Sequence, residues 1–231
     1  SSEEIKETMA REHRRALDII GLPRSNLFAW DYDDLGLDTG RHRLPLLRDM
    51  VGLIRRVRPA TVVTMDPKNA PNDENSDHVL VARVSFEAAA LSPHPHLFPE
   101  QFEDPGAAHH FVSRILFYMT PEPDTFIDIE GEPFDTKVRM GLAYPSQLEL
   151  MITEAKKRLE GLGMQSPLLD APAETLWPMI CEEISKDAAG AAAAAGDGKK
   201  LRLAEQFRQH LPGVVEKIKG IFQGDLGFED T

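Results

Sequence analysis

The stretch Ala60-Thr-Val-Val-Thr-Met-Asp-Pro-Lys-Asn-Ala-Pro-Asn-Asp-Glu-Asn-Ser-Asp-His78 decides how this chain folds. Residues 60–65 are apolar or β-branched, which is typical of a buried strand. Residues 66–78 are polar and rich in Pro and Asn, and residues 79–91 return to an apolar pattern that predicts a helix. A polar loop between a buried strand and a helix is where an open α/β sheet builds its ligand site. We therefore expect half of a functional site in this loop.

The chain on either side of this loop alternates predicted helices with predicted strands. Helices are predicted over residues 2–20, 44–57, 79–91 and 134–159, the last with a break near Pro145, and strands over 26–30, 61–65, 114–119 and 125–129. The prolines of residues 92–99 exclude regular structure there. This alternation predicts the α/β class, with a Rossmann-like, mostly parallel sheet and helices on both faces.

The domain organisation follows from the same pattern. Residues 1–160 are predicted to form one Rossmann-like domain, and residues 161–231 a helical C-terminal part of that domain. The Ala- and Gly-rich residues near 187–198 are interpreted as a flexible surface insertion, after which a helix is expected from Lys199 to about Ile221. On the helix of residues 44–57, the side chains of Arg48, Arg55 and Arg56 are expected to face solvent.

Composition excludes several classes of protein. The chain has 231 residues, of which 42% are hydrophobic and 28% charged, as in a globular protein with a real core. Its net charge of −12 argues against nucleic-acid binding, because no basic surface is available to bind phosphates. A single cysteine, Cys181, rules out both a disulfide framework and a Cys-rich zinc site, and is most simply a core residue. No apolar run is long enough to span a membrane, and a cytoplasmic location is expected.

His78 is the strongest candidate for chemistry. Asp73, Glu74, Asn75 and Asp77 lie just before it, and an imidazole with carboxylates is a common set of zinc ligands. Asp77 is adjacent in sequence to His78, so it is better placed to orient a neighbour or cap the helix than to bind the same ion. The alternative is a half-buried histidine that simply starts a helix.

Two further histidines, His94 and His96, alternate with prolines and would share one face of an extended chain. They could bind a metal, but an exposed Pro-rich loop is the simpler interpretation.

The loop ending in Asn75-Ser-Asp-His78 resembles the His-x-Asp-His element of the PIG-L/LmbE-like zinc-dependent N-acetylglucosaminyl deacetylases. Further segments resemble this family in the same order: Arg11-Glu12 with Ala16 and Ile20-Gly21, residues 28–35, Arg58-Pro-Ala-Thr-Val-Val-Thr, Asp128-Ile, Lys137, Ser146-Gln147, and Ala204-Glu205-x-Phe207. The resemblance covers about residues 8–150 and the segment near 204.

The resemblance implies a Zn²⁺ held by two histidines and an aspartate, an aspartate that acts as general base on the metal-bound water, and a histidine that stabilises the oxyanion or protonates the amine. Carried onto this sequence, His78 matches the last zinc ligand and Asp77 the aspartate before it. Asn75 stands where the family has the histidine, and Tyr144 where it often has a histidine before Ser-Gln. Asparagine can donate a hydrogen bond to an oxyanion but cannot shuttle a proton. No substrate-binding residue is assigned.

The family's first element, Ala-His-Pro-Asp-Asp-Glu, which supplies the remaining ligands and the base, is not in this sequence. We expect an N-terminal truncation that lacks the first strand, so that the full-length protein is the enzyme and this chain alone is inactive. The expected reaction is zinc-dependent removal of an N-acetyl group from a GlcNAc-type sugar conjugate, a small-molecule substrate. The alternatives are a non-catalytic sugar-binding or interaction protein on the same scaffold, and an unstable fragment.

Overall fold

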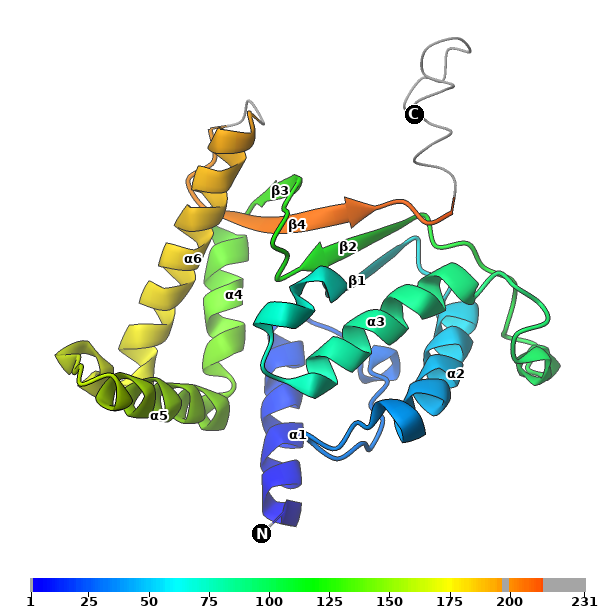
Figure 1. Ribbon diagram of the computed structural model, residues 1–231, viewed down its shortest axis with the longest axis horizontal. Helices are drawn as coiled ribbons and strands as arrows, with labels where there is room; N and C mark the ends of the chain where they lie inside the picture. Colours follow the sequence, from blue (N-terminus) through cyan, green and yellow to red (C-terminus); the bar gives the residue numbers. More distant parts are fainter. Residues whose placement is uncertain (1, 197–199, 214–231) are drawn as a thin grey trace. The chain divides into compact units, whose positions relative to one another are not determined.

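The computed structural model describes residues 2–196 and 200–213 and confirms the α/β class (Figure 1). Its longer elements are α1 (Ser2–Ile19), α2 (Thr39–Val57), β1 (Thr61–Met65), α3 (Ser76–Leu91), β2 (Arg114–Tyr118), β3 (Thr125–Asp128), α4 (Glu132–Leu142), α5 (Pro145–Gly161), α6 (Ala173–Ala195) and β4 (Ala204–His210). Short 3-10 turns are η1 (Arg24–Asn26), η2 (Pro67–Asn72), η3 (Pro99–Glu103) and η4 (Pro167–Asp170). Most of these bounds agree with the predicted helices and strands, and β1 agrees residue for residue.

The four strands form a mixed sheet in the order β1-β2-β4-β3. β1 and β2 are parallel, and their register runs from Thr61 opposite Arg114 to Met65 opposite Tyr118. β4 is antiparallel to β2, with Ile115 opposite His210. Within the described residues β1 is therefore an edge strand, and the two parallel strands place their carboxyl ends next to each other.

The chain divides into two compact units. The first unit is Ser1–Trp30 with Phe126–Glu205, and the second unit is Asp31–Thr125 with Gln206–Thr231. The boundary expected at residue 160 is not a point where the chain passes between these units, and the domain division stays a prediction. None of the helices in the described part of the chain is both long and apolar enough to cross a membrane; the location in the cell stays a prediction.

In the second unit α2 and α3 pack against each other, and α3 packs on β1 (Figure 1). The core between them consists of buried aliphatic and aromatic side chains, chiefly Leu46, Leu47, Val51, Ile54, Leu80, Val84, Ile115 and Phe117. This core holds the strand, loop and helix of residues 61–91 in place.

In the first unit α4 contacts α1, α5 and α6. The α4–α6 contact is close because Gly141 has no side chain: a Cβ there would lie 2.1 Å from Nε1 of Trp177. That nitrogen donates to the carbonyl of Val138 at 3.2 Å. Cys181 is 1% exposed in α6, as expected of a core residue.

Two predictions for the C-terminal part are wrong. Residues 187–195 belong to α6 rather than to a flexible insertion, because alanine is the best helix former and Ala188, Ala189 and Ala192 bury their side chains. Residues 204–210 form β4 rather than a helix, because pairing with β2 outweighs the local helical preference. The rest of that predicted insertion and helix, residues 197–199 and 214–221, lies outside the described residues.

The predicted strand over residues 26–30 is also wrong. Arg24–Asn26 form the turn η1, and no strand of the described residues pairs with 27–30. Phe28 and Trp30 are 45% and 37% exposed, so this segment lacks both the ladder and the cover that a strand needs.

Arg55 was expected to face solvent, and this too is wrong, since it is 0% exposed. Its guanidinium donates to the carbonyls of Ser92, Phe98 and His94, and to Oε1 of Gln101 at 2.8 Å. The Pro-rich segment that follows α3 forms no regular ladder, so a buried cation supplies hydrogen bonds to its carbonyl groups, of which those of His94 and Phe98 also accept a backbone N–H.

Candidate functional site

The candidate site lies where β1 and β2 end. Met65 and Tyr118 are register partners at the carboxyl ends of these parallel strands. Residues 66–75, which include η2, connect β1 to α3. Ligands of open α/β sheets bind outside the carboxyl ends of the strands, so this loop is correctly placed to hold a ligand.

His78 lies in the first turn of α3. Its Nδ1 is 3.3 Å from Oδ2 of Asp73, and its side chain is 44% exposed against 12% for that of Asp73. The other oxygen of Asp73 accepts the backbone N–H of Asn75 at 2.9 Å, which fixes the carboxylate. A carboxylate on one ring nitrogen orients an imidazole and leaves the other nitrogen for a ligand.

The two residues predicted to be catalytic, Asn75 and Asp77, stabilise the start of the helix. Asn75 is the N-cap of α3, and its Oδ1 accepts the N–H of Asp77 at 2.9 Å. Oδ1 of Asp77 accepts the N–H of Leu37 at 3.1 Å, which ties the segment before α2 to the first turn of α3. Their catalytic roles stay predictions. The carboxylate that contacts His78 is that of Asp73. The sequence placed Asp73 among the acidic residues before His78 but predicted no function for it.

Asp66, directly after β1, is 2% exposed and was not predicted as a site residue. Its carboxylate accepts both Nε and Nη2 of Arg208, at 2.7 and 2.6 Å. It also accepts the Thr120 hydroxyl at 2.7 Å and the N–H of Lys68 at 2.9 Å. Burial by itself raises the pKa of Asp66, but the hydrogen bonds from Arg208 and Thr120 outweigh burial and lower this pKa from 3.8 to about 2.

Sequence reasoning missed Arg208 because residues 204–210 were predicted to be helical. The sequence offers only one signal for half of the pair, an aspartate at the carboxyl end of a predicted strand, because the segment Gln206-Phe-Arg-Gln209 has no polar–apolar alternation that would predict a strand.

Tyr118 ends β2 beside this loop. Burial raises the pKa of its hydroxyl, and the negative charge of Asp73 raises it further. The hydroxyl therefore stays protonated at neutral pH, and the hydrogen bonds among the described residues include none from it. Tyr118 is thus a half-buried donor next to the carboxylate that orients His78.

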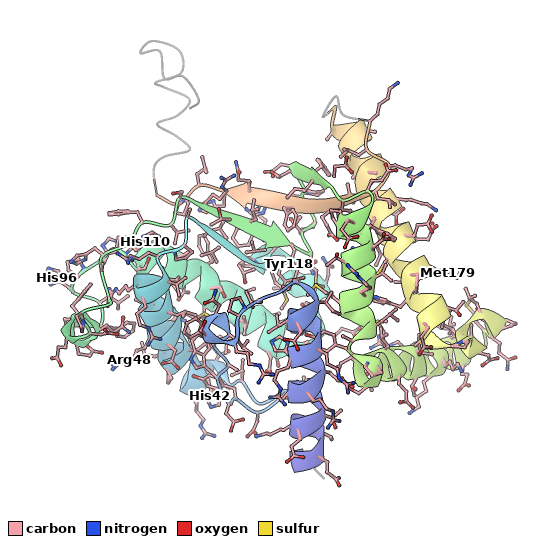
Figure 2. All side chains as sticks on the ribbon, turned by 180° about the vertical axis from the view of Figure 1, so that it is seen from behind. His42, Arg48, His96, His110, Tyr118 and Met179 are labelled. Atoms are coloured by element: carbon pink, nitrogen blue, oxygen red, sulfur yellow. The ribbon has the colours of Figure 1, made fainter. Side chains whose placement is uncertain are left out.

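A complete metal site does not form from these residues alone. Within residues 2–196 and 200–213, no group of three or more His, Cys, Asp and Glu side chains is arranged to hold a metal ion. His78 with Asp73 fits one ligand and its orienting group. His96 lies with His94 on the exposed loop after α3, and Nε2 of His110 is bonded to the carbonyl of Pro59 at 2.7 Å (Figure 2).

Several motif residues of the first unit pair with one another. The buried carboxylate of Glu12 accepts the Ser146 hydroxyl at 2.6 Å and the Ser146 N–H at 3.2 Å. The Lys137 ammonium is bonded to the carboxylate of Glu205. These contacts join helices and the start of β4, so they stabilise the fold.

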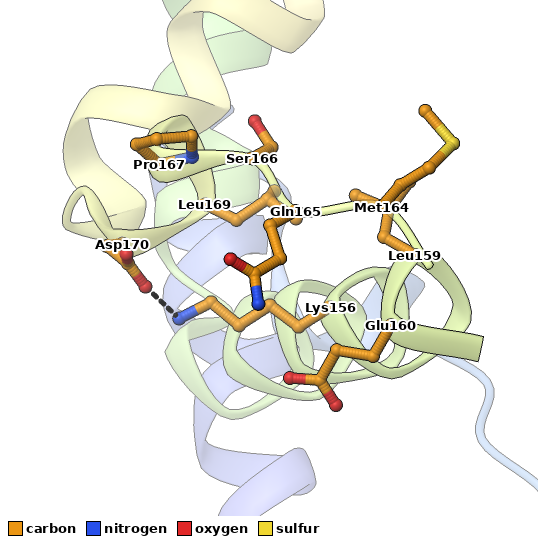
Figure 3. Close-up of a pocket in the computed structure, with 9 residues that line it drawn as sticks. All are labelled: Lys156, Leu159, Glu160, Met164, Gln165, Ser166, Pro167, Leu169 and Asp170. Carbon is orange, nitrogen blue, oxygen red and sulfur yellow. Dashed lines mark hydrogen bonds and ion pairs between the residues drawn. The ribbon is translucent and has the colours of Figure 1, made fainter. Parts of the chain in front are cut away.

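The first unit also has a surface cavity of about 280 Å³ between α5 and η4, where Lys156 and Asp170 form an ion pair at 2.9 Å (Figure 3). None of the predicted site residues lines this cavity.

Residues 1–89 match the family model described as "PIG-L: GlcNAc-PI de-N-acetylase", which confirms the resemblance predicted from the motifs. The structure is similar to that of an N,N'-diacetylchitobiose deacetylase from Pyrococcus horikoshii, with a TM-score of 0.68, 17% identity, and coverage of 99% of this chain and 69% of that one. It is also similar to GalB, the 4-carboxy-2-hydroxymuconate hydratase from Pseudomonas putida KT2440, with a TM-score of 0.56, 16% identity, and coverage of 93% and 75%. No curated protein matches the sequence. At these identities the two structural likenesses show the fold.

Proposed function

We propose that this chain, which matches a de-N-acetylase family model over residues 1–89, is part of a hydrolase that removes the N-acetyl group from a GlcNAc-type sugar conjugate. The observation that carries the proposal is the contact of His78 with Asp73 at the carboxyl end of β1. An imidazole held by a carboxylate at this edge of a sheet is the arrangement that metal-dependent hydrolases use for a ligand. The similar fold of a diacetylchitobiose deacetylase supports the same substrate class.

In this proposal His78 is one ligand of a Zn²⁺ ion, which supplies Lewis-acid chemistry to amide hydrolysis when bound. Asp73 keeps the ring of His78 in one orientation. The hydroxyl of Tyr118 and the amide of Asn75 are donors for the polar groups of the sugar conjugate or for its acetamide oxygen. The further ligands and the general base come from polypeptide outside the described residues, as the Ala-His-Pro-Asp-Asp-Glu element of the family implies.

The test compares His78→Ala with His96→Ala in the protein expressed from its complete gene. The assay is release of acetate from N,N'-diacetylchitobiose and from a GlcNAc–inositol conjugate, with bound zinc measured on the same samples. Removal of a metal ligand should lower both bound zinc and acetate release by roughly 100-fold or more. His96→Ala removes an exposed histidine and should change neither. Equal behaviour of the two variants would contradict the role of His78.

A non-catalytic, sugar-binding protein is the second candidate. The observation that favours it is the lack of a three-ligand group among the described residues. It predicts that the complete protein binds diacetylchitobiose without zinc and releases no acetate, which calorimetry and the same acetate assay would detect.

A further inference from the structure

The loop that carries Asp73 is fixed most firmly at its first residue. Both carboxylate oxygens of Asp66 accept hydrogen bonds from within the protein. The donors are Nε and Nη2 of Arg208, the Thr120 hydroxyl and the N–H of Lys68. The side chain of Asp66 is 0% exposed and that of Arg208 is 16% exposed. Three segments of the second unit therefore meet at one carboxylate: the end of β1, the turn after β2, and β4.

The guanidinium of Arg208 is suited to this contact in shape as well as charge. It makes parallel bonds to both oxygens of Asp66, and its Cζ lies 4.4 Å from the ring centroid of Phe117, which is 1% exposed in the core of the second unit. A planar fork that both pairs with a carboxylate and stacks on a ring is not replaced by a lysine ammonium. Arg208 thus connects the start of the loop to the core.

Just after Asp66, the loop is held by a weaker interaction. The ion pair of Lys68 with Glu122 is at 2.5 Å, but the two side chains are 51% and 62% exposed, and such pairs contribute little. At the far end the loop is fixed by the Asn75 cap and by the Leu37–Asp77 bond. Asp73 lies between these fixed ends. Its carboxylate accepts the N–H of Asn75 and so moves with the backbone of the loop, and its 3.3 Å contact with His78 is long enough to be lost by a small shift.

We propose that Arg208 is a positioning residue for this site: by holding Asp66 it fixes the path of residues 67–75 and so keeps the Asp73 carboxylate beside His78. The importance of that position for catalysis rests on the proposed function, but the placement itself does not. Arg208 touches neither His78 nor Asp73 and acts through the backbone of the loop.

The first test is hydrogen–deuterium exchange on the protein expressed from its complete gene, with Arg208→Met, Arg208→Lys and the matched control Arg43→Met. Arg43 also forms an arginine–carboxylate pair in the second unit, at 2.5 Å with Glu87, but with side chains 45% and 32% exposed. In Arg208→Met the amides of residues 68–70 and 72–75 should exchange roughly 10-fold faster or more, as expected when charge-assisted bonds that close a loop are removed, while those of α2 are unchanged. Arg208→Lys should show a smaller effect in the same residues, and Arg43→Met none.

An increase spread evenly over α2 and the loop, or an unchanged loop, would overturn the proposal, since Arg208 would then act only on overall stability or not at all. If Arg208→Met does not fold, Arg208→Lys decides the same question. A second measurement uses the complete protein: at a temperature where Arg208→Lys is folded, its kcat for acetate release should fall by roughly 10-fold with KM little changed. An unchanged kcat would overturn the positioning role. If the wild-type protein releases no acetate, the proposed function fails, and the exchange experiment still decides the role of Arg208.

Discussion

The two compact units use polar side chains in different ways. In the first unit Glu12 is paired with Ser146 and Lys137 with Glu205, so these groups are used within the chain. In the second unit Asp66 and Arg208 likewise bond to each other and are largely buried. Next to this pair, however, the ring of His78 is half-exposed and the hydroxyl of Tyr118 donates to none of the described residues.

A residue can match the deacetylase family for one of two reasons, structural or functional. Glu12 and Ser146 match family motifs and hydrogen-bond to each other between two helices, which indicates a structural role in a shared fold. His78 also resembles the family, but its partner, Asp73, leaves one ring nitrogen for a ligand. Family-like residues of the first unit should therefore affect stability, and those of the second unit near His78 should affect binding and turnover.

The largest expected effect is on the stability of the second unit, from Arg55→Met. This change leaves the carbonyl of Ser92 without its donor in a buried place, and it removes a charge-assisted bond from the carbonyls of His94 and Phe98. The free energy of unfolding should fall by about 3 kcal/mol or more, because an unsatisfied buried acceptor costs about 1–3 kcal/mol and each hydrogen bond to a charged group contributes about 1.5–3 kcal/mol. Urea denaturation followed by circular dichroism measures this loss.

The matched control is Arg56→Met, the next residue of α2, whose side chain is exposed. Its effect should be within about 0.5 kcal/mol, as for most surface substitutions. Similar losses in both variants would mean that burial of Arg55 contributes nothing beyond its charge.

A smaller effect is expected from acid on the Asp66–Arg208 pair. The folded-state pKa of Asp66, about 2, lies below its ordinary value of 3.8, so the stabilisation is complete above pH 3.8 and is lost as the pH falls toward 2. The lowered pKa corresponds to about 2 kcal/mol. Asp66→Asn has no charge to lose, so the difference in unfolding free energy between wild type and this variant should shrink by about that amount between pH 5 and pH 2.

Glu87→Gln serves as the comparison, because Glu87 forms an exposed ion pair with Arg43 in the same unit. Its difference from wild type should change little over the same range of pH. If the difference in unfolding free energy between wild type and Asp66→Asn is constant across this range, the buried pair does not depend on the charge of Asp66. That result would weaken the contrast between polar groups paired within the protein and those near His78 that remain exposed.

Much of this fold could be predicted from the sequence, because the local pattern and the tertiary structure agree there. The β1 strand and the helix that follows it both have apolar patterns of the right period. The helix of residues 187–195 follows the local preference of alanine, but the failures at β4 and at residues 27–30 share another cause, which is whether a strand far away in sequence is available as a partner. β4 forms because β2 is available to pair with it, whereas none of the four described strands includes residues 27–30 or runs alongside them.

The residues of the candidate site could be predicted only where they are local in sequence. His78 and the acidic residues before it are local in sequence, so their clustering was visible. Which carboxylate contacts the ring depends on the turn that η2 makes, and that selects Asp73 over Asp77. The contact of Asp66 with Arg208 spans the sheet and leaves no local signature.

The smallest effect separates stability from function in the first unit. Ser146→Ala removes the 2.6 Å bond to the carboxylate of Glu12, which is 3% exposed, and leaves only the longer N–H bond. The loss should be about 1–2 kcal/mol, since a hydrogen bond to a charged buried group is removed. Ser25→Ala, which removes an exposed 3.3 Å bond to Asn26, is the control and should cost less than about 0.5 kcal/mol. In the complete protein Ser146→Ala should release acetate at the wild-type rate per folded molecule, because the contact of Ser146 with Glu12 joins two helices and serves the fold. A lower kcat at unchanged stability would instead place this motif residue in the chemistry, and the division of roles between the two units would no longer hold.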